Sequence, residues 1–153
     1  MTDRTEAERR HLAAVTAANE SFYAAVEHGD IDALRSVWTR DREAVCVHPG
    51  AEPIHGTSAV LRSWSLIMAN TDYIQFFLTD VQITLSGDVA AVTCTENILT
   101  AGQGGSEVGE IAGQDTPAPF AGGKAQALNV FTRSTEGWHL WIHQASPVGS
   151  EVV

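Results

Sequence analysis

Asn129 and His143 are hydrogen-bonding side chains, and each lies in a short apolar run near the C-terminal end of the chain. The short turn between the two runs predicts an antiparallel hairpin, in which Asn129 is opposite His143 and Phe131 is opposite Trp141. An amide beside a neutral imidazole can donate and accept hydrogen bonds, as the binding of a carbonyl or enolate oxygen requires. The alternative is a polar pair that only fixes strand register or a dimer contact.

Glu96 and His48 are candidates for moving a proton. Glu96 shares one face of a predicted strand with apolar side chains, and burial there would raise its pKa toward that of a general base at neutral pH. A register shift of one residue would instead leave Glu96 in solvent. His48 precedes a proline that keeps its backbone extended, so it is either an acid, base or donor at a pocket rim or a residue that ties down the next loop.

Aromatic side chains can form the apolar walls of a pocket for a ring-shaped ligand, although we expect most of them to be core. The candidates are Tyr23, Trp38, Trp64, Tyr73 and Trp141. No metal site is predicted, because His139 and His143 would lie about 13 Å apart on a strand. The sequence contains no nucleophile or phosphate-binding motif in a suitable context, so we expect no cofactor.

Three helices are predicted to position these residues, because apolar side chains recur at helical spacing over residues 6–28, 31–38 and 57–69. Gly29 should end the first helix and Asp30 should cap the second. Thr57 or Ser58 is the expected cap of the third.

The remaining elements are predicted to be strands, at about residues 44–48, 73–85, 89–99, 124–133 and 138–145. In the first long strand the apolar pattern changes phase, which indicates a β-bulge near Thr79 and Asp80 that bends the sheet. Residues 100–123 are glycine-rich and are expected to form a flexible loop, either a lid or a disordered segment. The whole predicts one α+β domain over 1–153, with a core at about 8–147, whose curved antiparallel sheet wraps around the N-terminal helices as a cone with one open end.

The composition indicates a soluble globular protein, with 44% hydrophobic and 18% charged residues. Its net charge of -10 argues against binding to nucleic acid or to anionic membranes. No apolar segment is long enough for a signal or membrane span, so we expect an unanchored cytoplasmic protein. Cys46 and Cys94 have no metal or redox spacing and are expected to be buried thiols. Charge is sparse for a free surface, which indicates a hidden face.

Several segments, in this order, resemble the SnoaL-like bacterial branch of the nuclear-transport-factor-2-like superfamily, over about residues 8–147. They are Phe22-Tyr23 with Gly29-Asp30, Val47-His48-Pro49-Gly50, Gly56 with Val60 and Trp64, Gly87-Asp88-Val89-Ala90, and the closing hairpin through Pro147. The resemblance implies a cystatin-like α+β roll, a homodimer and a cone that encloses a small apolar or aromatic ligand. The family includes polyketide cyclases, ketosteroid isomerases, dehydratases and members that only bind or assemble.

Residues and resemblance together favour a cofactor-independent isomerase, dehydratase or cyclase that acts on an apolar carbonyl compound. Glu96 or His48 would move the proton, and Asn129 and His143 would stabilise the oxygen. The alternative is a non-catalytic dimeric ligand-binding or scaffold module, because the catalytic relatives are thought to use aspartates in the cone and this chain has none in the middle of a core strand. Polar groups that bond to one another with no open space would favour the scaffold.

Overall fold

The computed structural model describes residues 4–101 and 121–148, which form three helices and six strands. The helices are α1 (Glu6–Glu27), α2 (Ile31–Val37) and α3 (Thr57–Ala69). The strands are β1 (Val45–Val47), β2 (Ile54–His55), β3 (Tyr73–Ser86), β4 (Val89–Ala101), β5 (Ala121–Ser134) and β6 (Gly137–Pro147). Most of the predicted loop at 100–123 falls outside the described residues, and its two ends belong to β4 and β5. None of the described helices is long and apolar enough to cross a membrane.

The helix boundaries follow local chemistry. Gly29 has a φ of 62° just after α1, and the side chain of Asp30 accepts the N–H of Ala33 at 3.0 Å, as the sequence predicts. The predicted cap of α3 is wrong. Gly56 is the N-cap without a side-chain bond, because the hydroxyl of Thr57 donates to the Thr39 carbonyl at 3.0 Å instead.

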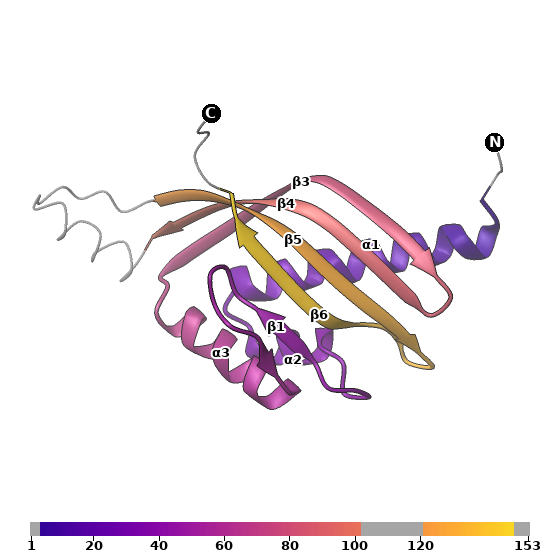
Figure 1. Ribbon diagram of the computed structural model, residues 1–153, viewed down its shortest axis with the longest axis horizontal. Coiled ribbons are helices and arrows are strands. Elements are labelled where there is room, and N and C mark those ends of the chain that lie inside the picture. Colours follow the sequence, from indigo (N-terminus) through magenta and orange to yellow (C-terminus); the bar gives the residue numbers. More distant parts are fainter. Residues whose placement is uncertain (1–3, 102–120, 149–153) are drawn as a thin grey trace, which may run out of the picture.

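The sheet has the strand order β2-β1-β6-β5-β4-β3 (Figure 1). The four long strands β3 to β6 pair antiparallel in sequence order, as predicted. The short strand β1 pairs parallel to β6 and antiparallel to β2, so the complete sheet is mixed. This pairing places Cys46 directly beside His143 and the C-terminal end of β1 beside β6.

Two irregularities bend the long strands. The predicted bulge is confirmed, because the pairing of β3 and β4 shifts between Thr79 and Gln82 and Asp80 has a φ of 55°. A second shift, which the sequence did not predict, lies between Val130 and Phe131. Phe131 therefore pairs with Leu140, and the predicted Phe131–Trp141 pair is wrong.

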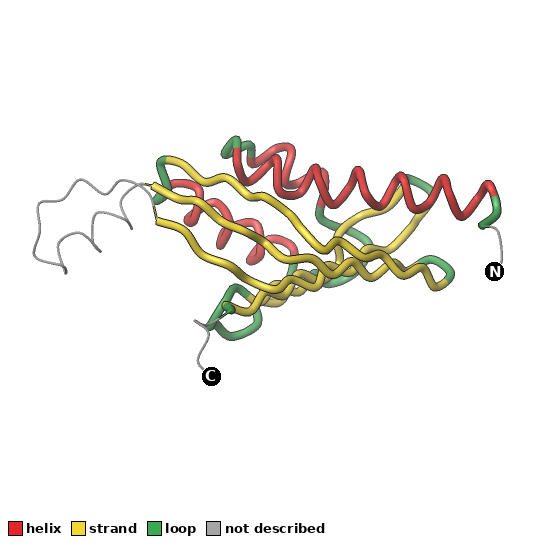
Figure 2. Tube along the Cα trace, turned by 90° about the horizontal axis from the view of Figure 1, so that it is seen from above, coloured by secondary structure: helices red, strands yellow, loops and turns green. Residues whose placement is uncertain are grey.

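All three helices lie on one face of the curved sheet, and the other face carries no described helix (Figure 2). The core fills the space between α1 and the sheet, and its largest fully buried side chains include Phe22, Leu34, Trp38, Phe131 and Leu140. Helices that cover one face of a largely antiparallel sheet confirm the predicted α+β roll.

Asp30→Ala should lower the free energy of unfolding by about 1 kcal/mol, because the N–H of Ala33 at the start of α2 loses its acceptor. Urea denaturation measures this change. Asp32→Ala is the matched control, since among the described residues the exposed side chain of Asp32 bonds only to Arg35 on the same helix and should contribute a few tenths of that amount. Equal losses in the two variants would contradict the capping role.

Candidate functional site

Buried polar side chains from α1, β4, β5 and β6 form one hydrogen-bonded group, which we call the buried network. Its members are Asn19, Tyr23, Glu96, Asn129 and His143. Each is at most 4% exposed. The network lies in the layer between α1 and the sheet, where apolar side chains surround it.

Local geometry brings the five residues together. Asn129 and His143 are directly opposite in the β5–β6 pairing, as the sequence predicts. Asn19 and Tyr23 are four residues apart on α1, so both lie on the helix face that covers the sheet. Glu96 points to the same side of β4 as the buried Val92 and Cys94, which confirms its predicted inward position.

Asn129 is the centre of the network. Its Nδ2 donates to Asn19 Oδ1 at 2.9 Å and to Tyr23 Oη at 3.1 Å, which uses both amide hydrogens. Its Oδ1 lies 2.6 Å from His143 Nδ1 and must accept a hydrogen bond from that atom. The network thus assigns the neutral His143 a proton on Nδ1 and a lone pair on Nε2. Burial, and then the nearby His48, lower the pKa of His143 to about 3.

Tyr23 and Glu96 form the acidic end of the network. The phenol donates to Glu96 Oε2 at 2.6 Å. Burial raises the pKa of Glu96, and this hydrogen bond offsets part of the rise. Burial and the charge of Glu96 also raise the pKa of Tyr23, so the phenol remains a donor. Within the described residues, the other carboxylate oxygen of Glu96 has no hydrogen-bond partner.

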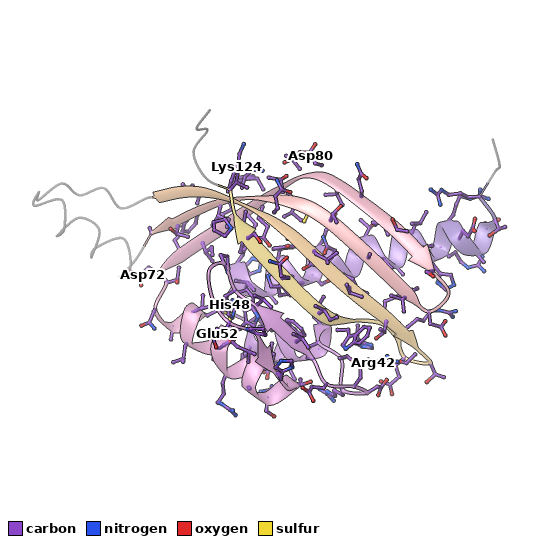
Figure 3. All side chains as sticks on the ribbon, in the orientation of Figure 1. Arg42, His48, Glu52, Asp72, Asp80 and Lys124 are labelled. Atoms are coloured by element: carbon purple, nitrogen blue, oxygen red, sulfur yellow. The ribbon has the colours of Figure 1, made fainter. Side chains whose placement is uncertain are left out.

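His48 belongs to a second, smaller group beside α3 (Figure 3). The Ser63 hydroxyl donates to the Val60 carbonyl at 2.8 Å, so it accepts from His48 Nε2 at 3.0 Å. This leaves Nδ1 of the neutral ring as an acceptor, and burial lowers the pKa of His48. Cys46 lies 3.7 Å from His48 Nε2, but burial raises its pKa to about 12, so it is a thiol rather than an activated nucleophile.

Trp64 separates the two histidines. Its ring centroid is 4.8 Å from that of His48 and 5.8 Å from that of His143. Within the described residues, the indole N–H of Trp64 is buried and has no oxygen or nitrogen acceptor, and its neighbour is the sulfur of Cys46, a weak acceptor whose pKa it lowers. A buried donor without a partner costs about 1–3 kcal/mol, so this N–H is a position where a bound oxygen would be stabilised.

The other predicted pocket aromatics lie in different surroundings. Tyr23 is part of the network, and Trp38 is buried with its ring edge-on to Phe22. Tyr73 is 40% exposed. Trp141, the extra residue at the second bulge, packs under Arg42 and donates to the Glu43 carbonyl in the loop between α2 and β1, so the structure does not join it to the network.

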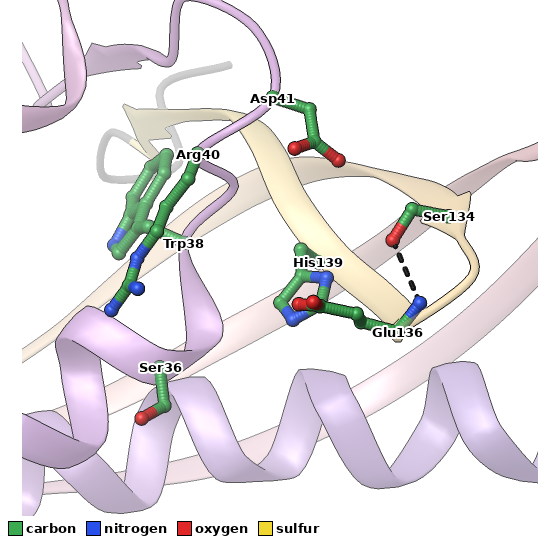
Figure 4. A pocket seen from close by; sticks show the side chains of 7 residues that line it. All are labelled: Ser36, Trp38, Arg40, Asp41, Ser134, Glu136 and His139. Carbon is green, nitrogen blue, oxygen red and sulfur yellow. Dashed lines mark hydrogen bonds between the residues drawn. The ribbon is translucent and has the colours of Figure 1, made fainter.

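Three surface hollows are lined by described residues, with volumes of about 190, 200 and 400 Å³. The first lies between the end of α1 and α3. The second is a polar hollow at the β5–β6 turn, lined by Ser36, Trp38, Arg40, Asp41, Ser134, Glu136 and His139 (Figure 4). The third lies between α1 and β3 and is the only one of these three that a network residue, Tyr23, lines.

The described parts of the chain hold no group of three or more His, Cys, Asp or Glu side chains that could bind a metal ion. The interior contains one carboxyl group, one phenol, two neutral imidazoles, two carboxamides, two thiols and the indole N–H groups of Trp38 and Trp64, which have no oxygen or nitrogen acceptor among the described residues. Such groups can transfer protons and bind an oxygen.

Sequence reasoning missed the role of Asn19. The residue was visible as a single polar side chain on the apolar stripe of the first helix, and this pattern indicates a buried hydrogen bond. Ser63, the partner of His48, gave no such signal, because serine is common on exposed helix faces.

Residues 15–150 match a family model described as a SnoaL-like domain. Among solved structures, a candidate dehydratase of the NTF2-like family from Streptomyces avermitilis is 44% identical to this chain. The alignment has a TM-score of 0.77 and covers 90% of this chain and 96% of that chain. A search of curated proteins finds no match.

Two further solved structures are similar. A candidate calcium/calmodulin-dependent protein kinase type II association domain from Thiobacillus denitrificans is 29% identical, with a TM-score of 0.69 and coverage of 88% of this chain and 94% of that chain. An NTF2-like protein with a cystatin-like fold from Novosphingobium aromaticivorans is 18% identical, with a TM-score of 0.67 and coverage of 99% and 94%. The latter supports the cystatin-like fold alone.

His143 should make the stability sensitive to acid. Its pKa falls from the ordinary 6.5 to about 3 on folding, so between these values the unfolded chain binds one proton more than the folded chain. The stabilisation is complete above pH 6.5 and is lost as the pH falls toward 3. His143→Gln should make the fall in unfolding free energy shallower by up to about 1.4 kcal/mol per pH unit.

Urea denaturation between pH 7 and pH 4 measures this slope. His28→Gln is the control, a histidine replacement of the same kind at an exposed position outside the buried network. Glu96 changes the unfolding free energy in the opposite direction: because folding raises its pKa, the fold loses stability as the pH increases. The effect of His143 is therefore read from the difference in slope between His143→Gln and the parent protein. A His143→Gln slope equal to that of the parent protein would show that His143 is not held neutral.

Proposed function

The chain belongs to the SnoaL-like domain family, and from that premise we propose that it binds a small apolar carbonyl compound and catalyses a cofactor-independent proton transfer on it. The reaction class is that of an isomerase, dehydratase or cyclase. The observation that carries the proposal is the buried Tyr23–Glu96 pair, 2.6 Å apart, which Asn129 connects to His143. The similarity to the candidate dehydratase from Streptomyces avermitilis supports the same class of chemistry.

In this mechanism the unpartnered oxygen of Glu96 accepts a proton from the carbon next to the carbonyl. The electron pair of that C–H bond moves to the carbonyl oxygen, which becomes an enolate. The buried indole N–H of Trp64, which has no oxygen or nitrogen acceptor among the described residues, is available to bind that oxygen in place of the weak Cys46 sulfur. Burial favours the reaction because it raises the pKa of Glu96 and so strengthens the base.

Asn129 and His143 have a different role here from the one that the sequence indicates. Both amide hydrogens of Asn129 and the Nδ1 hydrogen of His143 are already used within the network. They are therefore positioning residues, which hold Tyr23 against Glu96. His48, with a free Nδ1 on the other side of Trp64, is a second candidate base.

A non-catalytic scaffold is the second candidate, and one observation favours it. The polar groups of the network bond to one another, and Glu96, Asn129 and His143 line none of the three hollows described above. The 29% identity to a candidate association domain supports assembly as a function. In this case the network would serve only to join α1 to the sheet.

A homodimer through the helix-free face of the sheet fits both candidates. Side chains that alternate with Asn129 and His143 point to this face, and those at its centre carry no charge. They are Thr93, Thr95, Gln126, Leu128, Val130, Ile142 and Gln144. Two copies with a net charge of -10 each repel one another, so an uncharged face is where they can approach closely.

The catalytic proposal predicts that the protein accelerates exchange of the protons next to the carbonyl of a cyclic ketone such as 2-decalone in D₂O, followed by NMR. Glu96→Gln should reduce the rate about 10²- to 10⁴-fold, because the base is lost. Asn129→Leu should reduce it less, since it only displaces Tyr23. Glu136→Gln, at an exposed position away from the network, is the control.

The catalytic function and the scaffold function predict different exchange rates when a panel of cyclic and β-hydroxy ketones is measured. A rate above the buffer background that Glu96→Gln leaves unchanged would exclude Glu96 as the base. A dimer that accelerates exchange with no ketone of the panel would favour the scaffold.

The dimer should have a mass of twice 16.4 kDa in light scattering coupled to size exclusion. Leu128→Asp should convert it to a monomer, because it places a charge in the middle of the uncharged face. Leu66→Asp is the matched control, since Leu66 is an exposed leucine on α3, on the opposite side of the sheet. A monomeric parent protein, or dissociation by Leu66→Asp alone, would contradict this interface.

A further inference from the structure

His143 uses only one of its two ring nitrogens in the buried network. Its Nδ1 donates to Asn129 Oδ1 at 2.6 Å, so the neutral ring carries a lone pair on Nε2. Among residues 4–101 and 121–148, no side chain or backbone group donates a hydrogen bond to this Nε2. The fold therefore leaves a hydrogen-bond acceptor unpaired on a side chain that is only 2% exposed.

The orientation of the His143 ring is fixed by its neighbours. The ring packs against two aromatic rings, with its centroid 5.0 Å from that of Phe22 and 5.8 Å from that of Trp64. A flip of the imidazole would exchange Nδ1 for a C–H group, and the bond to Asn129 would be lost. Nε2 is thus held at the end of the ring that is distant from the β6 backbone, in the layer of buried side chains.

Trp64 provides the complementary group. Its side chain is 6% exposed, and its indole N–H faces only the weakly accepting sulfur of Cys46. The free N–H of Trp64 and the free Nε2 of His143 belong to neighbouring rings but do not bond to each other. Since buried polar groups are normally paired, this part of the interior fits a ligand that has one acceptor and one donor.

This requirement separates the possible ligands. The oxygen of a simple ketone can accept from Trp64, but the ketone has no hydrogen to donate, so Nε2 of His143 would lose contact with water and gain no partner. An ammonium group can donate to Nε2 but cannot accept from Trp64. A hydroxy ketone satisfies both residues, because its carbonyl oxygen accepts and its hydroxyl donates.

We propose that the site selects carbonyl compounds that carry a hydroxyl group, and that Nε2 of His143 accepts the hydrogen of that hydroxyl. This inference rests on the proposed function, because it names the substrate class of the same site. His143 then has two roles. Its Nδ1 positions Asn129, and its Nε2 determines which ketones bind.

Pairs of ketones that differ in one group test the preference. The pairs are 2-hydroxycyclohexanone with 2-fluorocyclohexanone and 4-hydroxycyclohexanone with 4-fluorocyclohexanone, since fluorine is close to a hydroxyl in size but cannot donate. Exchange of the protons next to the carbonyl is followed by NMR in D₂O, and each rate is divided by the rate in buffer. For at least one pair, kcat/KM should be about 5- to 150-fold higher for the hydroxy ketone, the effect of leaving one buried acceptor unpaired.

Nitrogen NMR of the full chain with ¹⁵N-labelled histidine tests the assignment to His143. The resonance of the unprotonated Nε2 should move upfield when the preferred hydroxy ketone binds, because its lone pair accepts a hydrogen bond. The fluoro ketone should leave the resonance in place. The ring nitrogens of the exposed His28 are the internal control. A purely structural role of His143 would produce no difference between the two ketones.

His143→Phe keeps an aromatic ring beside Phe22 and Trp64 but removes the acceptor. The ratio of the two kcat/KM values should fall to about one in this variant. His28→Phe is the matched control and should retain the ratio of the parent protein, because His28 is exposed and lies outside the network. If His143→Phe does not fold, the Nε2 resonance of the parent protein decides.

The outcomes separate this inference from the proposed reaction. Exchange that is accelerated equally for both members of each pair would overturn the hydroxyl site and leave the proposed reaction standing. Absence of exchange together with an Nε2 shift on addition of a hydroxy ketone would overturn the reaction and retain the site. A hydroxyl preference without an Nε2 shift would overturn the assignment to His143, as would an Nε2 that is hydrogen-bonded to water with and without ligand.

Discussion

The hydrogen bond from Tyr23 to Glu96 is the constraint on which the interior depends. A carboxyl group buried between a helix and a sheet is costly unless it has a partner, and Tyr23 is its one side-chain partner among the described residues. The phenol must therefore hold one orientation. Asn129 fixes it by donating to its oxygen, and His143 and Asn19 fix the orientation of Asn129 in turn. Each polar group is thus oriented by the next, from β6 to β4 through α1.

Much of the fold could be predicted from sequence patterns that span only a few residues. Helical periodicity located α1, α2 and α3, and the phase change in β3 located its bulge. The hairpin turn set the pairing of Asn129 with His143, because a short connection fixes the register near it. The same reasoning failed further along the hairpin, at Trp141, because the bulge between Val130 and Phe131 adds a residue on one strand without a signal in the apolar pattern.

Contacts between distant segments could not be predicted in this way. Tyr23 and Glu96 are 73 residues apart, and the parallel pairing of β1 with β6 joins segments from opposite halves of the chain. The inward position of Glu96 was predictable from alternation on one strand, but its partner was not, since nothing on α1 indicates which strand it faces. Sequence could therefore nominate Glu96, Asn129 and His143, whereas the roles of Asn19 and Tyr23 and the bonds between all five residues required the fold.

Charge limits which ligands the molecule can accept. The buried network contains a carboxyl group and no cation, and the neutral imidazoles of His48 and His143 add no positive charge, because burial lowers the pKa of both. An anionic ligand near Glu96 would raise the pKa of this carboxyl further and would meet no compensating group. In the reaction that we propose, a neutral carbonyl compound avoids this cost, since charge appears on its oxygen only as the proton moves to Glu96 and neutralises the carboxylate. The total charge of the interior would then remain constant through the proposed reaction, which is the condition under which a site of low dielectric constant can support proton transfer.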